Sequence, residues 1–189
     1  MTKKHTKGHL GGHCNITHVD IGALEFLVKR FHIQSLLDIG CGPGGQIDAA
    51  VGMSLSAEGI DGFPGDMVSP TAKITIHDFA DSAPTFLSKS FDLAWSCEFV
   101  EHVEEKYVPN YTHCFGLCNV AAITFAPPGK LGHHHVNCRK QEYWIKVFDE
   151  YGFDFLPEET EEFKKSSTMK NDFIRKHGLV FLSRKERVT

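Results

Sequence analysis

The sequence contains no apolar run near the roughly 18 residues that a membrane-spanning helix needs. Its first stretch, MTKKHTKGHLGGHCN, also lacks the apolar segment of a secretory signal. We therefore expect no association with a membrane and a cytoplasmic location.

The sequence also lacks an excess of positive charge. Its 20 Lys and Arg residues face 24 Asp and Glu residues, which gives a net charge of −4 with neutral histidines. Proteins that bind nucleic acids rely on clustered positive charge. A polynucleotide partner is therefore not favoured.

None of the six cysteines forms a C-x-x-C pair, the spacing typical of structural zinc sites and redox motifs. We therefore predict reduced thiols and no metal site. Two groups of nitrogen and sulfur donors are the alternative: His133, His135 and Cys138, and His113, Cys114 and Cys118.

The 189 residues, 41% of them hydrophobic, are sufficient for one core and short for two. We predict a single domain over 1–189, with a flexible tail over 1–15, an N-terminal helix or cap over 16–32 and a Rossmann-like core over 33–183. Strands that alternate with helices indicate an α/β sandwich with a mostly parallel sheet.

The expected elements follow from apolar periodicity and turn residues. Strands are expected over 35–40, 57–62, 72–80, 90–99, 119–129, 153–156 and 178–184, and helices from the N-cap Thr17 to 32 and over 45–53, 100–118 (broken at Pro109) and 139–152. The last two strands fit an antiparallel pair joined by a loop or short helix. We interpret the charged segment between them as a solvated face, with a substrate-side flap as the alternative.

The stretch LLDIGCGPGG places glycines directly after the first strand. Gly40, Gly42 and Gly45 fit the dinucleotide fingerprint, whereas Gly40, Gly42 and Gly44 fit a G-x-G-x-G loop that holds S-adenosylmethionine. Asp38 favours the second cofactor, because a carboxylate repels a pyrophosphate and attracts an ammonium group. The chain also has little room for the substrate part of a dehydrogenase. A fragment of an NAD-binding oxidoreductase is the alternative.

Four stretches, LLDIGCGPGG, EGIDG, IHDF and FDLAWSCEFVEHV, resemble successive motifs of the class I S-adenosylmethionine-dependent methyltransferases. The resemblance covers about residues 20–183. It implies a Rossmann-like, seven-stranded, mostly parallel sheet with an antiparallel edge strand and helices on both faces. The later stretch PPGKLGHHHVNCRKQEYWIKVFDEYGF is similar to small stand-alone methyltransferases of phages and glycan-modification clusters, which implies the host cytoplasm if the protein is phage-encoded.

The resemblance implies roles for residues at the strand ends. Asp38 would lie near the cofactor's ammonium group, Asp61 would bind its ribose and Asp78 would meet the adenine. The further contacts expected from it are Gly40, Gly42, Gly44, Gly62, Phe63, Phe79, Ser96, Cys97 and Glu98.

We also expect the segment GGHCNITHVD to cap the cofactor, with His18 and Asp20 as its main contributors. The tail histidines before them are separated by glycines, which argues against a stable helix there.

Three histidines are the predicted catalytic residues. His134 and His135 follow a Pro-Pro-Gly loop after the fifth strand, and His102 follows the fourth. An imidazole near neutral pH can take a proton from a hydroxyl. A flexible polar loop and a structural His102 are the alternatives.

The predicted reaction is the transfer of a methyl group from S-adenosylmethionine to a hydroxyl, with an amine as second choice, and S-adenosylhomocysteine is the product. Because the chain is short, the acceptor is expected to be a small molecule, a sugar or another accessible group. A non-catalytic methyltransferase-like binding module is the alternative from another class. The oligomeric state is left open.

Overall fold

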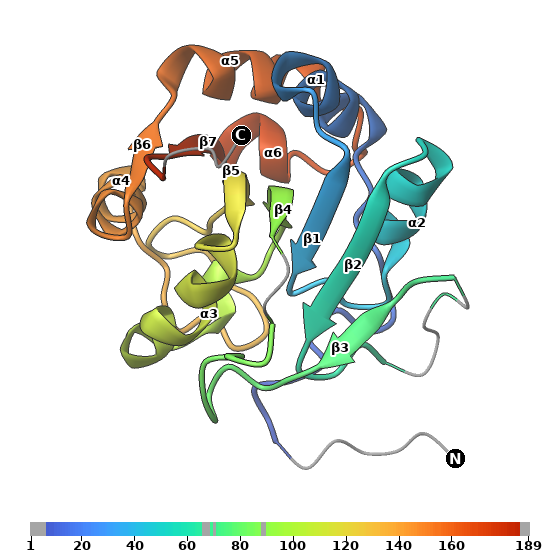
Figure 1. The fold of residues 1–189 in the computed structure, drawn as a ribbon. Coiled ribbons are helices and arrows are strands. Elements are labelled where there is room, and N and C mark those ends of the chain that lie inside the picture. Colours follow the sequence, from blue (N-terminus) through green and yellow to red (C-terminus); the bar gives the residue numbers. More distant parts are fainter. Residues whose placement is uncertain (1–6, 66–68, 70, 88–89, 186–189) are drawn as a thin grey trace.

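The computed structural model describes residues 7–65, 69, 71–87 and 90–185. Seven strands form one sheet in this part of the chain (Figure 1). They are β1 (Ser35–Ile39), β2 (Ser56–Asp61), β3 (Ile74–Ile76), β4 (Phe91–Ser96), β5 (Cys118–Thr124), β6 (Phe153–Phe155) and β7 (Gly178–Ser183). Their order is β3-β2-β1-β4-β5-β7-β6.

The sheet is mixed, as predicted. The pairs from β3 across to β5 are parallel, and β7 pairs antiparallel with both β5 and β6. The antiparallel strand β7 therefore lies one position inside the edge, and the short strand β6 covers its outer side. The sequence order reverses at β1, which has β2 on one side and β4 on the other. In open α/β sheets, ligands bind at such a switch point, beyond the carboxyl ends of the strands.

Helices cover both faces of the sheet (Figure 1). The helices are α1 (Ile21–Phe31), α2 (Gly45–Gly52), α3 (Val108–Phe115), α4 (Gln141–Glu150), α5 (Pro157–Ser166) and α6 (Phe173–His177). Alternate residues of β5 enter two separate cores, with Ala121 and Ile123 in one and Val120 and Ala122 in the other. None of the helices in the described residues is both long and apolar enough to cross a membrane.

Two predicted helices differ from the observed ones. Helix α1 begins at Ile21 instead of after Thr17, because Asp20 is the N-cap. The helix expected over 100–118 is two 3-10 turns, Val100–His102 and Glu105–Tyr107, followed by α3. Pro109 lies in the first turn of α3 and so helps it to begin instead of breaking it, since proline is tolerated where no amide donor is needed.

The charged segment 157–177 forms two helices, α5 and α6, so the connection between the last two strands is helical, which was one of the two forms expected. Its few apolar side chains face inward, and Phe163 and Ile174 are fully buried in the core that α1 also enters. The charged residues of α5 lie on its outer side, where Lys164 and Lys165 pair with glutamates one turn earlier. The interpretation of a solvated face therefore holds for one side of α5 only.

Asp20 connects two segments of the fold through hydrogen bonds and does not line the cavity described below. This corrects the expectation that it contributes to a cofactor cap. Its side chain is fully buried and accepts hydrogen bonds from the amides of Ala23 at 3.0 Å and Thr168 at 2.9 Å. The hydroxyl of Ser167 also donates to it. Asp20 thereby joins the start of α1 to the segment after α5.

Replacing Asp20 should therefore destabilise the fold. We expect Asp20→Ala to lower the free energy of unfolding by about 2–4 kcal/mol, because a helix cap and several buried charge-assisted hydrogen bonds are lost together. Urea denaturation followed by circular dichroism measures this value. Glu25→Ala, an exposed site on the same helix, is the control and should change it little. Equal stability of both variants would contradict the assignment.

Candidate functional site

A cavity of about 560 Å³ lies at the carboxyl ends of β1, β2 and β4. Most of the cofactor-binding and catalytic residues predicted from the sequence line this cavity. Its lining includes Asp38, Gly40, Gly42, Asp61, Gly62, Asp78, Phe79, Cys97, Glu98 and His18, together with all three predicted catalytic residues, His102, His134 and His135.

Three of the predicted cofactor residues, Gly44, Phe63 and Ser96, do not line the cavity. Gly44 is the N-cap of α2 with a φ of +90°, and a Cβ there would lie 2.7 Å from Ala72. The Ser96 hydroxyl donates to the carbonyl of Ile39 at 2.9 Å and so ties β4 to β1. Their contacts with a cofactor stay predictions, and their observed role is to support the walls of the site.

The glycine loop exposes bare backbone to the cavity. Gly40 and Gly42 have φ values of +76° and +49°, which favour glycine. A Cβ on Gly40 would overlap the ring of Phe99. The Asp61 carboxylate holds the loop in this shape, because it accepts from the amides of Gly42 at 2.9 Å and Phe63 at 2.7 Å.

Two buried acids form the floor of the cavity. Asp38 is only 3% exposed, and burial raises its pKa well above the ordinary value, with the nearby charge of Asp61 as a second cause. Burial also raises the pKa of Asp61, and the hydrogen bonds from Gly42 and Phe63 oppose this rise. The floor therefore concentrates negative charge that a cationic ligand would stabilise.

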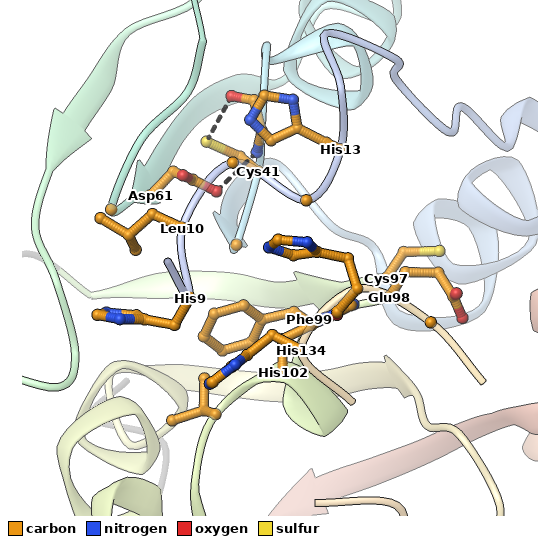
Figure 2. Close-up of a pocket in the computed structure, with 18 of the residues that line it drawn as sticks. His9, Leu10, His13, Cys41, Asp61, Cys97, Glu98, Phe99, His102 and His134 are labelled. Atoms are coloured by element: carbon orange, nitrogen blue, oxygen red, sulfur yellow. Dashed lines mark hydrogen bonds between the residues drawn. The ribbon is translucent and has the colours of Figure 1, made fainter. Parts of the chain in front are cut away.

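The described part of the tail, residues 7–15, forms the roof of the cavity. Figure 2 shows His9, Leu10 and His13 at the same cavity as Asp61 and Cys41. His13 Nε2 lies 2.8 Å from the carbonyl of Phe63. That the tail is loose without a ligand and that the segment GGHCNITHVD caps a cofactor both stay predictions. The residues of that segment that line the cavity are Gly11, Gly12, His13, Ile16, Thr17 and His18.

Asp78 anchors this roof, a contact that the sequence did not indicate. Its carboxylate accepts from Lys7 Nζ at 2.7 Å and lies 3.0 Å from His9 Nε2. Partial burial raises the pKa of Asp78, but the hydrogen bond from Lys7 and those from Ala80 and His9 outweigh it and leave the pKa below its ordinary value.

Histidines from two elements meet at the opposite end of the cavity. His102 Nδ1 lies 2.7 Å from the carbonyl of His133, and His135 Nδ1 lies 3.0 Å from that of Lys130. Their ring centroids are 4.8 Å apart. Burial lowers the pKa of His102 to about 4, so its imidazole is neutral at pH 7. His134 has a φ of +46°, and its ring lies 5.8 Å from that of His9.

Glu101 lies behind these histidines and was not singled out from the sequence. It is fully buried, and neither of its carboxylate oxygens has a hydrogen-bond partner among the described residues. Burial raises the pKa of Glu101 well above its ordinary value, and the adjacent Glu98 carboxyl raises it further. Burial raises the pKa of Glu98 to about 7.

One group of three possible metal-ligand residues occurs in the described part of the chain: Glu101, His102 and His135, whose ligand atoms lie within 4.8 Å of one another. The two donor groups considered from the sequence do not form such a cluster in these residues. The thiols of Cys114 and Cys118 are buried and free, and the Cys118 thiol donates to the carbonyl of Cys114.

No protein-family model matches the chain, and no curated protein matches it. Solved structures do match it, at 12–19% identity for those considered. The chain has the fold of the S-adenosylmethionine-dependent methyltransferases, a Rossmann-like sheet with helices on both faces.

A TehB-like S-adenosylmethionine-dependent methyltransferase from Corynebacterium glutamicum matches with a TM-score of 0.63 and 16% identity, over 86% of this chain and 88% of that one. The methyltransferase domain of a bacterial protein, CtHen1-C, matches with a TM-score of 0.58 and 17% identity, over 86% and 96%. Magnesium protoporphyrin IX methyltransferase from Synechocystis, solved with bound S-adenosylhomocysteine, has a TM-score of 0.57 and 15% identity, over 85% and 80%.

The raised pKa of Asp38 predicts how its replacement changes stability with pH. The folded protein holds this proton more tightly than the unfolded chain, so its stabilising contribution is complete below the ordinary pKa of 3.8 and is lost as the pH rises. Asp61, Cys41 and Cys97 face Asp38 from β2, the glycine loop and the end of β4, and none of them brings a positive charge.

We therefore expect Asp38→Asn to have a higher melting temperature than the wild type at pH 8, and a much smaller advantage near pH 4. Differential scanning fluorimetry over this pH range measures the gap. Glu25→Gln, an exposed acid on α1, should show no such dependence. If the difference in melting temperature between Asp38→Asn and the wild type became smaller with rising pH, this would contradict the burial of an unpaired carboxylate at this position.

Proposed function

We propose that this protein is an S-adenosylmethionine-dependent methyltransferase that acts on a hydroxyl of a small molecule, sugar or other accessible acceptor. The observation that carries the proposal is the buried Asp38 with the half-buried Asp61 beside a glycine loop at the switch point of a methyltransferase fold. Solved neighbours of the same fold contain bound S-adenosylmethionine or S-adenosylhomocysteine.

The residues present fit this cofactor. Asp38 would receive the ammonium group, because it is buried, close to a second acid and without a protein cation facing it. Asp61, at the end of β2, would bind the ribose. The bare backbone of Gly40 and Gly42 leaves room for the methionine part.

At the other end of the cavity, Phe79 and Asp78 would meet the adenine. Phe79 is 4% exposed and is held edge-on by Phe99 and Tyr111, which gives the wall a fixed apolar surface. Asp78 already accepts hydrogen bonds from Lys7 and His9, so adenine binding and tail position would be linked at this residue.

S-adenosylmethionine supplies an activated methyl group, and in its transfer a carbon–oxygen bond forms while the carbon–sulfur bond breaks. The chain's residues need to hold the acceptor oxygen in line and to receive its proton. Cys97 and Glu98, just beyond β4, line the same cavity as the glycine loop and the histidines. We assign His134, at the open end of the cavity, as the base, with His135 and His102 beside it.

The two alternatives from the sequence are less well supported. An NAD-binding oxidoreductase would place a pyrophosphate against the buried Asp38, where like charges repel. A non-catalytic binding module does not require histidines from two elements at the acceptor end of the cavity. The stretch HHHVN supports the small stand-alone subtype associated with phages or glycan modification, acting in the cytoplasm.

Cofactor choice is tested by calorimetric titration with S-adenosylhomocysteine and, separately, NADH. We expect S-adenosylhomocysteine to bind and NADH not to bind. Asp61→Asn should weaken S-adenosylhomocysteine binding by about 1–3 kcal/mol, because charge-assisted hydrogen bonds to ribose are lost. Asp154→Asn on the edge strand β6 is the control, and thermal unfolding checks that both variants are folded. Binding of NADH alone would overturn the proposal.

The role of His134 is tested by replacement with asparagine, which tolerates its left-handed backbone. We expect His134→Asn to lower methyl transfer to responsive hydroxyl acceptors by about 100-fold or more while the affinity for S-adenosylhomocysteine stays unchanged. His32 also has a positive φ, of +55°, so His32→Asn is a matched control that should keep full turnover. Equal activity of the two variants would exclude His134 as the base.

A further inference from the structure

We propose that Glu101, His102 and His135 bind a divalent transition-metal ion at the acceptor end of the cavity. Glu101 and His102 come from the 3-10 turn after β4, and His135 comes from the loop after β5. The catalytic consequence described below rests on the proposed methyltransferase function, whereas metal binding itself does not.

The first support is proximity. The available ligand atoms of the three residues lie within 4.8 Å of one another. Ligand atoms of a tetrahedral metal at about 2.1 Å are about 3.4 Å apart, so small side-chain rotations complete the set. Two backbone hydrogen bonds hold the elements together, because the carbonyl of Glu101 accepts from the amides of Val136 at 3.1 Å and Asn137 at 3.0 Å.

The second support is the orientation of the imidazoles. Nδ1 of His102 faces the carbonyl of His133, and Nδ1 of His135 faces the carbonyl of Lys130. A carbonyl accepts only, so each Nδ1 carries a proton, and Nε2 is the ring nitrogen left for a metal ion. Metal-binding histidines are typically fixed in this way by a backbone carbonyl on the other ring nitrogen.

The third support is the buried carboxylate. Glu101 is fully buried, and no hydrogen bond of ordinary geometry satisfies either of its carboxylate oxygens within the described residues. The groups that act on this carboxylate are the amides of Glu101 and Phe99 and a second acid, Glu98, and none of them brings a positive charge. A buried carboxylate without a partner is costly, and a cation between it and the two imidazoles would compensate both its charge and its unused lone pairs.

The donor set indicates the kind of ion. Two imidazole nitrogens and one carboxylate oxygen suit zinc, iron(II), cobalt(II) or manganese(II), whereas magnesium and calcium prefer sites built from oxygen alone. Both histidines line the cavity, so the remaining coordination positions would face the acceptor. A hydroxyl bound there would become more acidic, and its proton would pass to His134 while the oxygen receives the methyl group. No oxidation or reduction is involved.

The test uses the full chain without an affinity tag, stripped with a chelator and titrated with cobalt(II) and zinc. We expect one equivalent of cobalt(II) to bind with visible d–d absorption, and zinc to displace it. Glu101→Gln, His102→Ala and His135→Ala should each weaken cobalt(II) binding at least about tenfold, since each removes a ligand. Glu101→Gln keeps the shape of the side chain and serves if an alanine variant fails to fold.

Two controls separate this site from other histidines. His32→Asn, outside the cavity, and the tail double variant His9→Ala/His13→Ala should keep the one-equivalent cobalt(II) signal. Loss of binding in the tail variant, or full binding in Glu101→Gln and His102→Ala, would overturn the proposed site. Absence of stoichiometric binding by the wild type would overturn it as well.

The same samples are titrated with S-adenosylhomocysteine. Metal binding without S-adenosylhomocysteine binding would leave the metal site standing and remove the methyltransferase function. S-adenosylhomocysteine binding without metal binding would do the reverse. If the protein binds both the metal and S-adenosylhomocysteine, adding zinc or cobalt(II) to the chelator-treated wild type should restore methyl transfer. The same addition should not restore methyl transfer in Glu101→Gln.

Discussion

The concentration of buried carboxylates at one edge of the sheet is the constraint on which the site depends. Asp38 and Asp61 lie at the ends of β1 and β2, and Glu98 and Glu101 follow β4. Each of these acids has a raised pKa because burial disfavours its charged form. Four such groups close together lower the stability of the folded protein, and the binding of positively charged ligands would raise it again.

The four acids divide into two pairs with different surroundings. Asp38 and Asp61 lie beside the glycine loop and under the tail, where the cavity offers bare backbone and the Asp61 hydrogen bonds hold the loop open. Glu98 and Glu101 lie near the imidazoles of His102 and His135, which line the same cavity. The surroundings of the first pair suit the organic cation of the proposed cofactor, and those of the second pair suit the proposed metal ion.

The tail connects these two halves. Lys7 and His9 bind Asp78, and the ring of His9 lies near that of His134. His13 contacts the carbonyl of Phe63, which follows β2. One short segment of the tail therefore contacts three separate parts of the chain around the cavity.

The sequence by itself predicted the seven strands in their order, the helices α1, α2 and α4, the glycine loop and the acids Asp38, Asp61 and Asp78 at the strand ends. These features depend on local periodicity and on residues that end strands. Only the tertiary structure decided which residues face the cavity. The burial of Glu101 depends on a 3-10 turn in place of the expected helix, and the burial of Asp20 on hydrogen bonds to residues almost 150 positions away. Such contacts leave no local pattern, since the partners of a buried polar group are chosen by packing between distant segments.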